Sequence, residues 1–385
     1  VLATEEPLVT SNLFDIAADL DTPVSAYLKL NSFRPRFLLE SVEGGERLAR
    51  YSFIGFGDCL EFRLDSSGMR IGDAVLPRPD DRETLLAALR RALGEAPRPA
   101  LEGQAFPLLG GMVGAAGYDL VRYFERLPAH ARAADDCPEA HYVAPSSLLV
   151  FDHLTRRVAL LHAGGEKERL SLRREVIRAL RGGLPGPAWQ ASYSKPQGSL
   201  TEADFLRGVD RTKEYIAAGD VYQLVLSVCF GGRCDLDPFE VYRALRLLNP
   251  SPYMYFCELG ERVVVGSSPE ALVKLNGQSA QMRPIAGTRP RGENPQQDQA
   301  FEAELLADPK ENAEHVMLVD LARNDLGRVA AAGSVKVDPF RSIERYSHVM
   351  HIVSGVNGQL APGKDAFDLF AAAFPAGTLV GAPKV

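Results

Sequence analysis

The stretch PIAGTRPRG, residues 284–292, brings a glycine, a hydroxyl group and two guanidinium groups together. Gly287 lets the backbone approach a ligand closely, and Thr288 offers a hydroxyl. Arg289 and Arg291 offer forked donors that suit carboxylates. The pattern indicates an anion-binding loop at the end of a strand. Taken alone, the stretch fits a solvated turn with two surface arginines at least equally well, so its neighbours in the sequence must decide.

Two carboxylates follow on a helix that is predicted to begin near Pro309 in DPKENAEHVMLVDLARNDLGR. Glu311 and Glu314 stand three residues apart and therefore project from one helix face. Carboxylate oxygens suit Mg²⁺, which is often shared with water and an anionic substrate. Acidic residues near a helix N-terminus are also explained by the helix dipole, at about 0.3–1 kcal/mol. Beside an arginine-bearing loop, a magnesium ion that bridges to a polycarboxylate substrate is the better hypothesis.

Two histidines occur in RYSHVMHIVSGV, residues 345–356, which is predicted as a strand. Alternation along a strand sends His348 and His351 to opposite faces, so they do not form a simple metal pair. One can face the site and transfer protons near neutral pH, although a single strand histidine is more often structural. The segment 374–385, FPAGTLVGAPKV, is predicted as a loop that leads into a helix, a suitable place for an anion.

The composition is that of a folded protein with no concentrated positive charge. The 385 residues are 46% hydrophobic and 24% charged, with a formal net charge of −7. This balance argues against nucleic acid as a partner, because phosphate binding needs a positive surface. The sequence contains no apolar run of about 18 residues and does not begin like a secretory signal. We therefore expect no membrane span and a cytoplasmic location.

The elements that must position these residues fall on two sides of a glycine- and proline-rich stretch, 181–200, which is predicted as a linker between regions 1–180 and 201–385. Apolar spacing predicts strands and helices in the first region. The strands are expected over 24–30, 37–41, 50–57 and 143–152, and the helices over 82–93 and 167–180.

In the second region, Thr201 and Asp204 stand at capping-box spacing, and Gly219 can end the helix that they begin. The elements expected after it are a strand over 221–230, a helix over 238–248, and strands over 253–259, 262–268 and 271–277. Strands that follow one another closely pair antiparallel, so the sequence predicts an α/β fold of the α+β type.

Four ordered segments, PIAGTRPRG, DPKENAEHVMLVDLARNDLGR, YSHVMHIVSGV and FPAGTLVGAPK, closely resemble the chorismate-utilising enzymes. Within that family the similarity is greatest to component I of anthranilate synthase. Similar aminodeoxychorismate synthases typically carry a nucleophilic lysine where this chain has Ala286, and isochorismate and salicylate synthases use a lysine at the position of Gln223. Both absences favour ammonia as the attacking group. The resemblance implies large, mostly antiparallel sheets packed as a sandwich with helices on the outside.

The resemblance also implies a reaction, in which chorismate and ammonia give anthranilate and pyruvate. A glutamine amidotransferase subunit would deliver the ammonia within a hetero-oligomer. Magnesium would be held by Glu314 and Glu311, and Gly287 and Thr288 would contact the substrate. The catalytic residues implied are His351, Glu270 and Thr288.

A second implied site binds tryptophan as feedback inhibitor. The segments 37–41, FLLES, and 249–256, NPSPYMYF, resemble the two effector-binding segments of anthranilate synthases. From their pattern alone they are a strand end and a proline-rich turn. The effector residues implied are Glu40, Ser41, Pro252, Tyr253 and Met254.

Members of the family continue beyond GAPK with further metal and substrate ligands, whereas this chain ends at Val385. We therefore expect a C-terminally incomplete chain. If the polypeptide itself stops there, part of the active site is missing and its activity should be weak or absent. Two alternatives stay open at this point. One is another chorismate enzyme, such as an aminodeoxychorismate synthase that lacks the lysine. The other is a non-catalytic protein that binds tryptophan.

Overall fold

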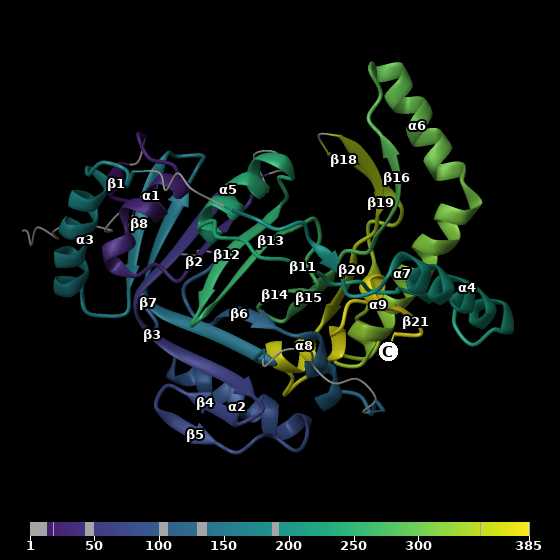
Figure 1. Cartoon of the computed structure of the whole chain (residues 1–385), viewed down its shortest axis with the longest axis horizontal. Coiled ribbons are helices and arrows are strands. Elements are labelled where there is room, and N and C mark those ends of the chain that lie inside the picture. Colours follow the sequence, from purple (N-terminus) through teal and green to yellow (C-terminus); the bar gives the residue numbers. More distant parts are fainter. Residues whose placement is uncertain are drawn as a thin grey trace, which may run out of the picture.

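The computed structural model describes residues 14–17, 19–42, 50–99, 107–128, 137–186, 192–346 and 348–384. Residues 187–191 of the expected linker and Val385 lie outside these ranges. The named strands pair antiparallel throughout. The predicted α/β class with large antiparallel sheets is thus confirmed, and Figure 1 shows the helices arranged around those sheets.

The helices are α1 (Pro23–Lys29), α2 (Arg82–Glu95), α3 (Glu166–Leu180), α4 (Glu202–Ala218), α5 (Pro238–Leu248), α6 (Pro295–Ala307), α7 (Pro309–Gly327), α8 (Ala366–Ala373) and α9 (Gly377–Val380), with 3₁₀ turns at Asn31–Phe33 and Tyr118–Tyr123. The strands are β1 (Ile16–Ala17), β2 (Phe37–Glu40), β3 (Tyr51–Asp65), β4 (Gly68–Ile71), β5 (Ala74–Leu76), β6 (Val113–Ala116), β7 (Ala140–Asp152), β8 (Arg157–His162), β9 (Gln197–Gly198), β10 (Gln223–Leu224), β11 (Phe230–Gly231), β12 (Tyr253–Leu259), β13 (Arg262–Ser268), β14 (Lys274–Asn276), β15 (Ser279–Met282), β16 (Ile285–Pro290), β17 (Lys336–Val337), β18 (Ser342–Arg345), β19 (Val349–Val353), β20 (Val356–Gln359) and β21 (Gly381–Ala382).

The largest sheet combines strands from both sides of the expected linker. Its main path runs β1-β8-β7-β3-β2-β12-β13, with β4 and β6 attached to β3 and β7. One face of this sheet is covered by α1, α3 and α5, where Tyr27, Tyr242 and Phe256 belong to one buried cluster. Smaller sheets, β14-β15-β20-β17 and β16-β19-β18, lie beside α7 and α6 (Figure 1). The division into regions 1–180, 181–200 and 201–385 stays a prediction.

The helix ends that carry capping residues are confirmed. Thr201 accepts a hydrogen bond from the backbone N–H of Asp204 at the start of α4, and Gly219 ends this helix with a positive φ of 82°. Asp308 accepts from the backbone N–H groups of Lys310 and Glu311 at the start of α7. These caps satisfy backbone N–H groups that the helix itself leaves unpaired.

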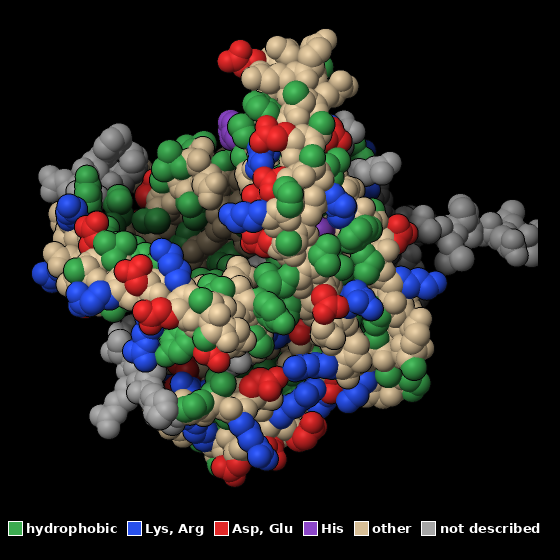
Figure 2. Space-filling model, turned by 90° about the vertical axis from the view of Figure 1, so that its right-hand side faces the viewer, with side chains coloured by type: hydrophobic (Ala, Val, Ile, Leu, Met, Phe, Trp, Pro, Cys, Tyr) green, Lys and Arg blue, Asp and Glu red, His purple; other side chains and the backbone are tan. Residues whose placement is uncertain are grey.

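Along α4, none of the described side chains is buried. Apolar residues of α4 such as Leu206 and Ile216 are exposed, at 54% and 42%. Figure 2 looks onto the side of the molecule that carries α4, and hydrophobic side chains lie there among charged ones.

Residues 24–29 belong to helix α1, so the strand predicted over 24–30 is wrong. Thr22 and Ser25 form a reciprocal capping box, and Pro23 occupies the first turn of α1. Pro23, Ala26 and Tyr27 are its buried residues, which is a helical spacing. The capping signal therefore outweighs the strand-like alternation.

The stretch 284–292 is mostly strand, so the predicted loop is also wrong. Ile285–Pro290 forms β16 and pairs with β19 around a bulge at Gly287, whose φ is +71°. His348 lies just before β19 rather than within it.

The long strand predicted over 221–230 is wrong. Of the strand predicted over 221–230, only β10 and β11 form, because the described segments beside them, β21 and β9, are equally short. The segment 374–385 leads into the short helix α9, as predicted, and continues into β21.

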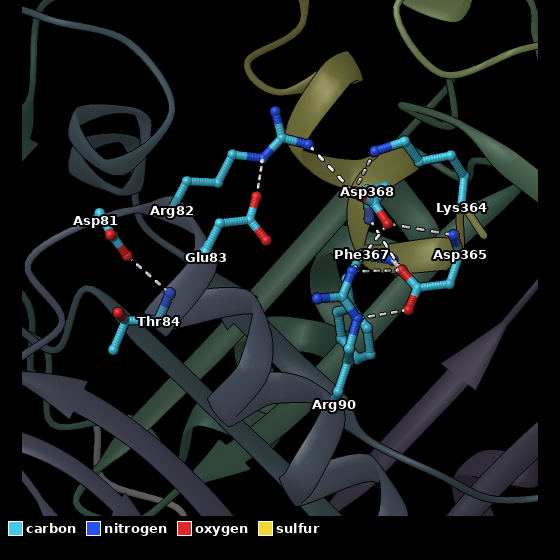
Figure 3. A network of polar contacts seen from close by, with 9 residues as sticks. All are labelled: Asp81, Arg82, Glu83, Thr84, Arg90, Lys364, Asp365, Phe367 and Asp368. Carbon is cyan, nitrogen blue, oxygen red and sulfur yellow. Dashed lines mark hydrogen bonds and ion pairs between the residues drawn. The ribbon is translucent and has the colours of Figure 1, made fainter. Parts of the chain in front are cut away.

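Two arginines of α2 hold the first turn of α8 (Figure 3). Arg90 donates to both carboxylates at the start of α8, with Nε 2.7 Å from Asp365 and a terminal nitrogen 2.8 Å from Asp368. Arg82 lies 3.4 Å from the other oxygen of Asp368, which is 4% exposed. Because α8 leads directly into residues 376–379 of the candidate site, these ion pairs position one of its walls.

Candidate active site

A cavity of about 510 Å³ lies between the large sheet, β15 and α7. Tyr255 and Ser268 line it from β12 and β13, and Asp325 lines it from α7. Gly377 on α9 closes another side. The cavity therefore joins the β12–β13 hairpin to α7 and α9, which are distant from it in the sequence, and Glu270, a predicted catalytic residue, also lines it.

Glu270 follows β13 directly and is held there through its backbone. The hydroxyl of Ser268 donates to the carbonyl oxygen of Glu270 at 2.9 Å. Burial raises the pKa of Glu270 from 4.5 to about 7, because the neutral acid is favoured away from water. A carboxyl group with this pKa exchanges protons readily near neutral pH, which suits general acid–base catalysis.

Gly287, Thr288 and His351 come together where β16 and β19 pair. Thr288 lies opposite His351 in the register, with Oγ1 and Nδ1 separated by 3.1 Å. The same Nδ1 lies 3.0 Å from the carbonyl oxygen of Gly287. Since a carbonyl only accepts, Nδ1 carries a proton and donates it to Gly287. The hydroxyl proton of Thr288 is then free to be donated elsewhere.

Glu311 and Glu314 provide the carboxylates that were expected to hold magnesium. Glu311 packs against the bulge, since a Cβ atom added to Gly287 would stand 3.1 Å from its Oε2. Glu314 lines a second cavity of about 1010 Å³ on the outer side of α7, together with Gln223. No cluster of three potential ligands was found in the part of the chain that the structure describes. Two hard carboxylates fit a magnesium ion that takes its other ligands from water and substrate.

The predicted anion site at Arg289 and Arg291 is wrong, because carboxylates of the chain itself occupy both guanidinium groups. Arg289 donates to Glu304 and Asp308 at 2.8 and 2.9 Å. Arg291 donates to Asp298 at 2.7 Å. These arginines fasten β16 to α6 and to the start of α7, and they thereby fix the bulge that carries Thr288.

The five residues expected to bind tryptophan lie together at the end of β2 and the start of β12. Glu40 pairs with Met254 across the two strands, and both side chains are buried. Ser41 is half-buried and Pro252 is buried, whereas Tyr253 is 44% exposed. The structure therefore assembles the two segments into one surface region.

Two residues that hold Glu40 escaped the sequence reasoning. Tyr242 on α5 donates its hydroxyl to Glu40, and Arg246 donates to the same carboxylate at 3.0 Å. Burial raises the pKa of Tyr242, so it remains a donor. The available signal was the four-residue spacing of a tyrosine and an arginine, which places both on one face of α5.

A buried ion pair beside the cavity was also missed. The ammonium group of Lys384 lies 2.9 Å from Asp325 and 2.8 Å from the carbonyl oxygen of Ala373, at the end of α8. Burial raises the pKa of Asp325 and lowers that of Lys384, while their pairing opposes both changes. The pair fastens residues after α9 to the cavity-facing side of α7.

Comparison with known proteins identifies the family. Residues 34–385 match the model of a family described as chorismate binding enzyme. The chain belongs to the chorismate binding enzyme family. Its relatives include a protein of Thermus thermophilus named anthranilate synthase component 1, which is 44% identical over 373 residues, or 96% of this chain and 79% of the relative. A protein of Synechocystis with the same name is 44% identical over 400 residues, covering 96% and 78%.

Solved structures agree with this assignment. Anthranilate synthase component I from Streptococcus pneumoniae superposes on this chorismate binding enzyme with a TM-score of 0.75 and 29% identity, covering 96% of this chain and 81% of that one. The menaquinone-specific isochorismate synthase of Escherichia coli gives a TM-score of 0.61 at 16% identity, covering 94% and 73%, and shows the fold alone. None of the helices in the described ranges combines the length and apolar character needed to cross a lipid bilayer.

Proposed function

We propose that this chain is component I of an anthranilate synthase and converts chorismate and ammonia into anthranilate and pyruvate. The observation that carries the proposal is the cavity lined by Glu270, whose pKa is raised to about 7. That cavity lies in a chain 44% identical to a protein named anthranilate synthase component 1. Ala286 and Gln223, where related enzymes use lysine, favour ammonia as the nucleophile.

Glu270 and His351 are the proposed proton carriers. Addition of ammonia to the ring needs a proton on the departing hydroxyl, and release of pyruvate needs a proton taken from the ring. Glu270 is poised to exchange protons near neutral pH. His351 is held through Nδ1 by Gly287 and Thr288, which leaves Nε2 for proton transfer. Gly287 and Thr288 are proposed to contact the substrate.

Glu314 and Glu311 are the proposed magnesium ligands. When bound, the ion would neutralise the ring carboxylate of chorismate and fix its position. Arg289 lies 4.0 Å from Glu311, and this ion pair orients the carboxylate beside the bulge.

Partners and regulation complete the proposal. A glutamine amidotransferase subunit supplies ammonia in a hetero-oligomer, and tryptophan inhibits through the region formed by Glu40, Ser41, Pro252, Tyr253 and Met254. The proximity of Glu40 to Met254 supports this effector site. A cytoplasmic location and the absence of nucleic acid as a partner remain predictions.

The test is anthranilate fluorescence from the protein that contains these 385 residues, with chorismate, magnesium and an ammonium salt, with and without tryptophan. Ammonium removes the need for the amidotransferase. Anthranilate formation that stops after chelation of magnesium, and that tryptophan lowers, is the expected result. Glu270→Gln should reduce turnover at least about 100-fold, whereas Glu261→Gln, at an exposed glutamate in the β12–β13 turn, should not change it.

A different aromatic product from chorismate, or tryptophan binding by a folded chain without turnover, would contradict the proposal. The first result would indicate another chorismate enzyme, such as an aminodeoxychorismate synthase. The second would indicate a non-catalytic tryptophan-binding protein.

A further inference from the structure

Two adjacent serines at the end of β13 face opposite sides of the large sheet. Met254 on β12 lies opposite Ser267 on one side and opposite Glu40 on the other, so these three residues form a row across three strands. Tyr253 lies opposite Ser268. Opposed residues in an antiparallel sheet share a face, and successive residues alternate between faces. Ser267 therefore shares a face with the effector residues Glu40 and Met254, whereas Ser268 shares the other face with Tyr253.

Ser267 fastens the turn that leads into the effector residues. Its hydroxyl oxygen lies 2.6 Å from the carbonyl oxygen of Asn249 and 2.7 Å from the hydroxyl of Ser251. Asn249 ends α5, the helix that supplies Tyr242 and Arg246 to Glu40. Ser251 is only 5% exposed, so its hydroxyl depends on this internal partner.

Ser268 makes the corresponding contact on the catalytic side. It lines the same cavity as Glu270, and its hydroxyl donates to the Glu270 carbonyl at 2.9 Å. A further small cavity is lined jointly by Pro252 and Tyr253 from the effector segment and by Glu270. The two neighbouring residues Ser267 and Ser268 therefore link the effector turn to the catalytic Glu270.

We propose that Ser267 is a positioning residue that couples tryptophan binding to the placement of Glu270. A shift of the Asn249–Ser251 turn passes through the Ser267 hydroxyl into β13, and from there to Ser268 and the Glu270 backbone. This inference rests on the proposed function, including tryptophan as the inhibitor. Coupling between two sites is reciprocal, so chorismate must weaken tryptophan binding by the same factor, typically about 5- to 150-fold.

The test measures that factor directly. Tryptophan Kd is determined by calorimetry on the full chain with magnesium, with and without chorismate, and without ammonium so that no turnover occurs. We expect chorismate to raise the Kd at least about fivefold in the original chain. In Ser267→Ala, the ratio of the tryptophan Kd with chorismate to the Kd without it should fall below about two, because the hydroxyl that links the two sites is missing. Ser267→Thr, which keeps the hydroxyl, should restore most of it.

Two controls make the result decisive. Ser279→Ala, at an exposed serine on β15, should leave the ratio unchanged. Ser251→Ala removes one of the two Ser267 contacts and should lower the ratio partially, and it replaces Ser267→Ala if that variant does not fold.

An unchanged ratio in Ser267→Ala, or in Ser251→Ala if only that variant folds, overturns the inference. So does an original chain that forms anthranilate but binds tryptophan equally well with and without chorismate, and in that case the proposed reaction stands. Absence of anthranilate from the original chain with ammonium present identifies failure of the proposed function itself.

Discussion

Gly287 lies so close to Glu311 that a Cβ atom at position 287 would stand 3.1 Å from the Glu311 Oε2 atom and 2.9 Å from Leu305. Because its φ is +71°, a side chain there is also strained. We expect Gly287→Ala to lower the free energy of unfolding by about 2–4 kcal/mol and to displace the Glu311 carboxylate, raising the magnesium concentration needed for activity. Urea unfolding and magnesium titration measure the two effects.

Gly277 offers the matched control for this substitution. Its φ is +58°, and a Cβ atom there meets nothing within 4 Å. Gly277→Ala should therefore cost only the backbone strain of about 1–2 kcal/mol and leave the magnesium response unchanged. An equal shift of the magnesium response in both variants would show that the Gly287–Glu311 contact is unimportant.

The hydroxyl of Thr288 is expected to donate a hydrogen bond to the substrate, because the Nδ1 atom of His351 does not accept its proton. Thr288→Val keeps the shape of the side chain and removes this donor, so kcat/KM should fall about 3- to 10-fold, the value of one neutral hydrogen bond. Thr288→Ser keeps the hydroxyl and should remain within about twofold. Steady-state kinetics with ammonium compare the two, and equal losses would mean that packing, not the hydroxyl, matters at this position.

Glu270 should lower the free energy of unfolding as the pH rises. The folded state holds its proton up to about pH 7, whereas an ordinary carboxyl group loses it near 4.5. Because the folded state binds the proton more tightly, this group destabilises the fold as pH rises through that interval, and its destabilising effect is complete above about pH 7. We expect Glu270→Gln to raise the free energy of unfolding by about 1–3 kcal/mol at pH 8 and much less at pH 4.5. Urea unfolding at both values measures the difference, and an increase of similar size at both would contradict the assigned burial effect.

Arg90 should contribute more to stability than its neighbour Arg91. Arg90 contacts both carboxylates at the start of α8, and one of them, Asp368, is nearly inaccessible to water. Arg90→Ala leaves that carboxylate with fewer partners, so we expect a loss of about 1–3 kcal/mol. Arg91 forms an exposed pair with Glu95, and Arg91→Ala should cost less than about 0.5 kcal/mol. Thermal unfolding of both variants gives the comparison. Equal unfolding midpoints would show that the α2–α8 ion pairs do not stabilise the fold.

Local signals made several elements predictable from the sequence. Helix α4 begins after the cap Thr201, and α7 begins at Pro309. In each helix the capping side chain and the backbone N–H groups that it accepts from lie within four residues of each other. The same kind of signal explains the mistake at α1, where the Thr22 capping box outweighed an alternating pattern. Elements whose boundaries are set by neighbours in the sequence are therefore the ones that sequence reasoning locates.

The geometry of the candidate site was harder to predict from the sequence, because it depends on contacts between residues that are distant in the chain. The sequence indicated that Arg289 faces a ligand, but the position of Glu304 and Asp308 relative to β16 decides that it does not. Glu270 was included only through the family resemblance, and its burial, which gives a physical reason for its role, is visible only in the fold.

The pairing of β2 with β12 also has a consequence for biosynthesis. Glu40 and Met254 meet only after roughly 200 further residues have been made. At a synthesis rate of about 5–20 residues per second, β2 waits on the order of 10–40 seconds on the ribosome for its partner strand. During that interval one edge of the sheet has unpaired N–H and C=O groups, which can attract other extended chains. Exposure to aggregation should therefore be greatest before residue 259 is synthesised, and it should fall once β12 has closed that edge.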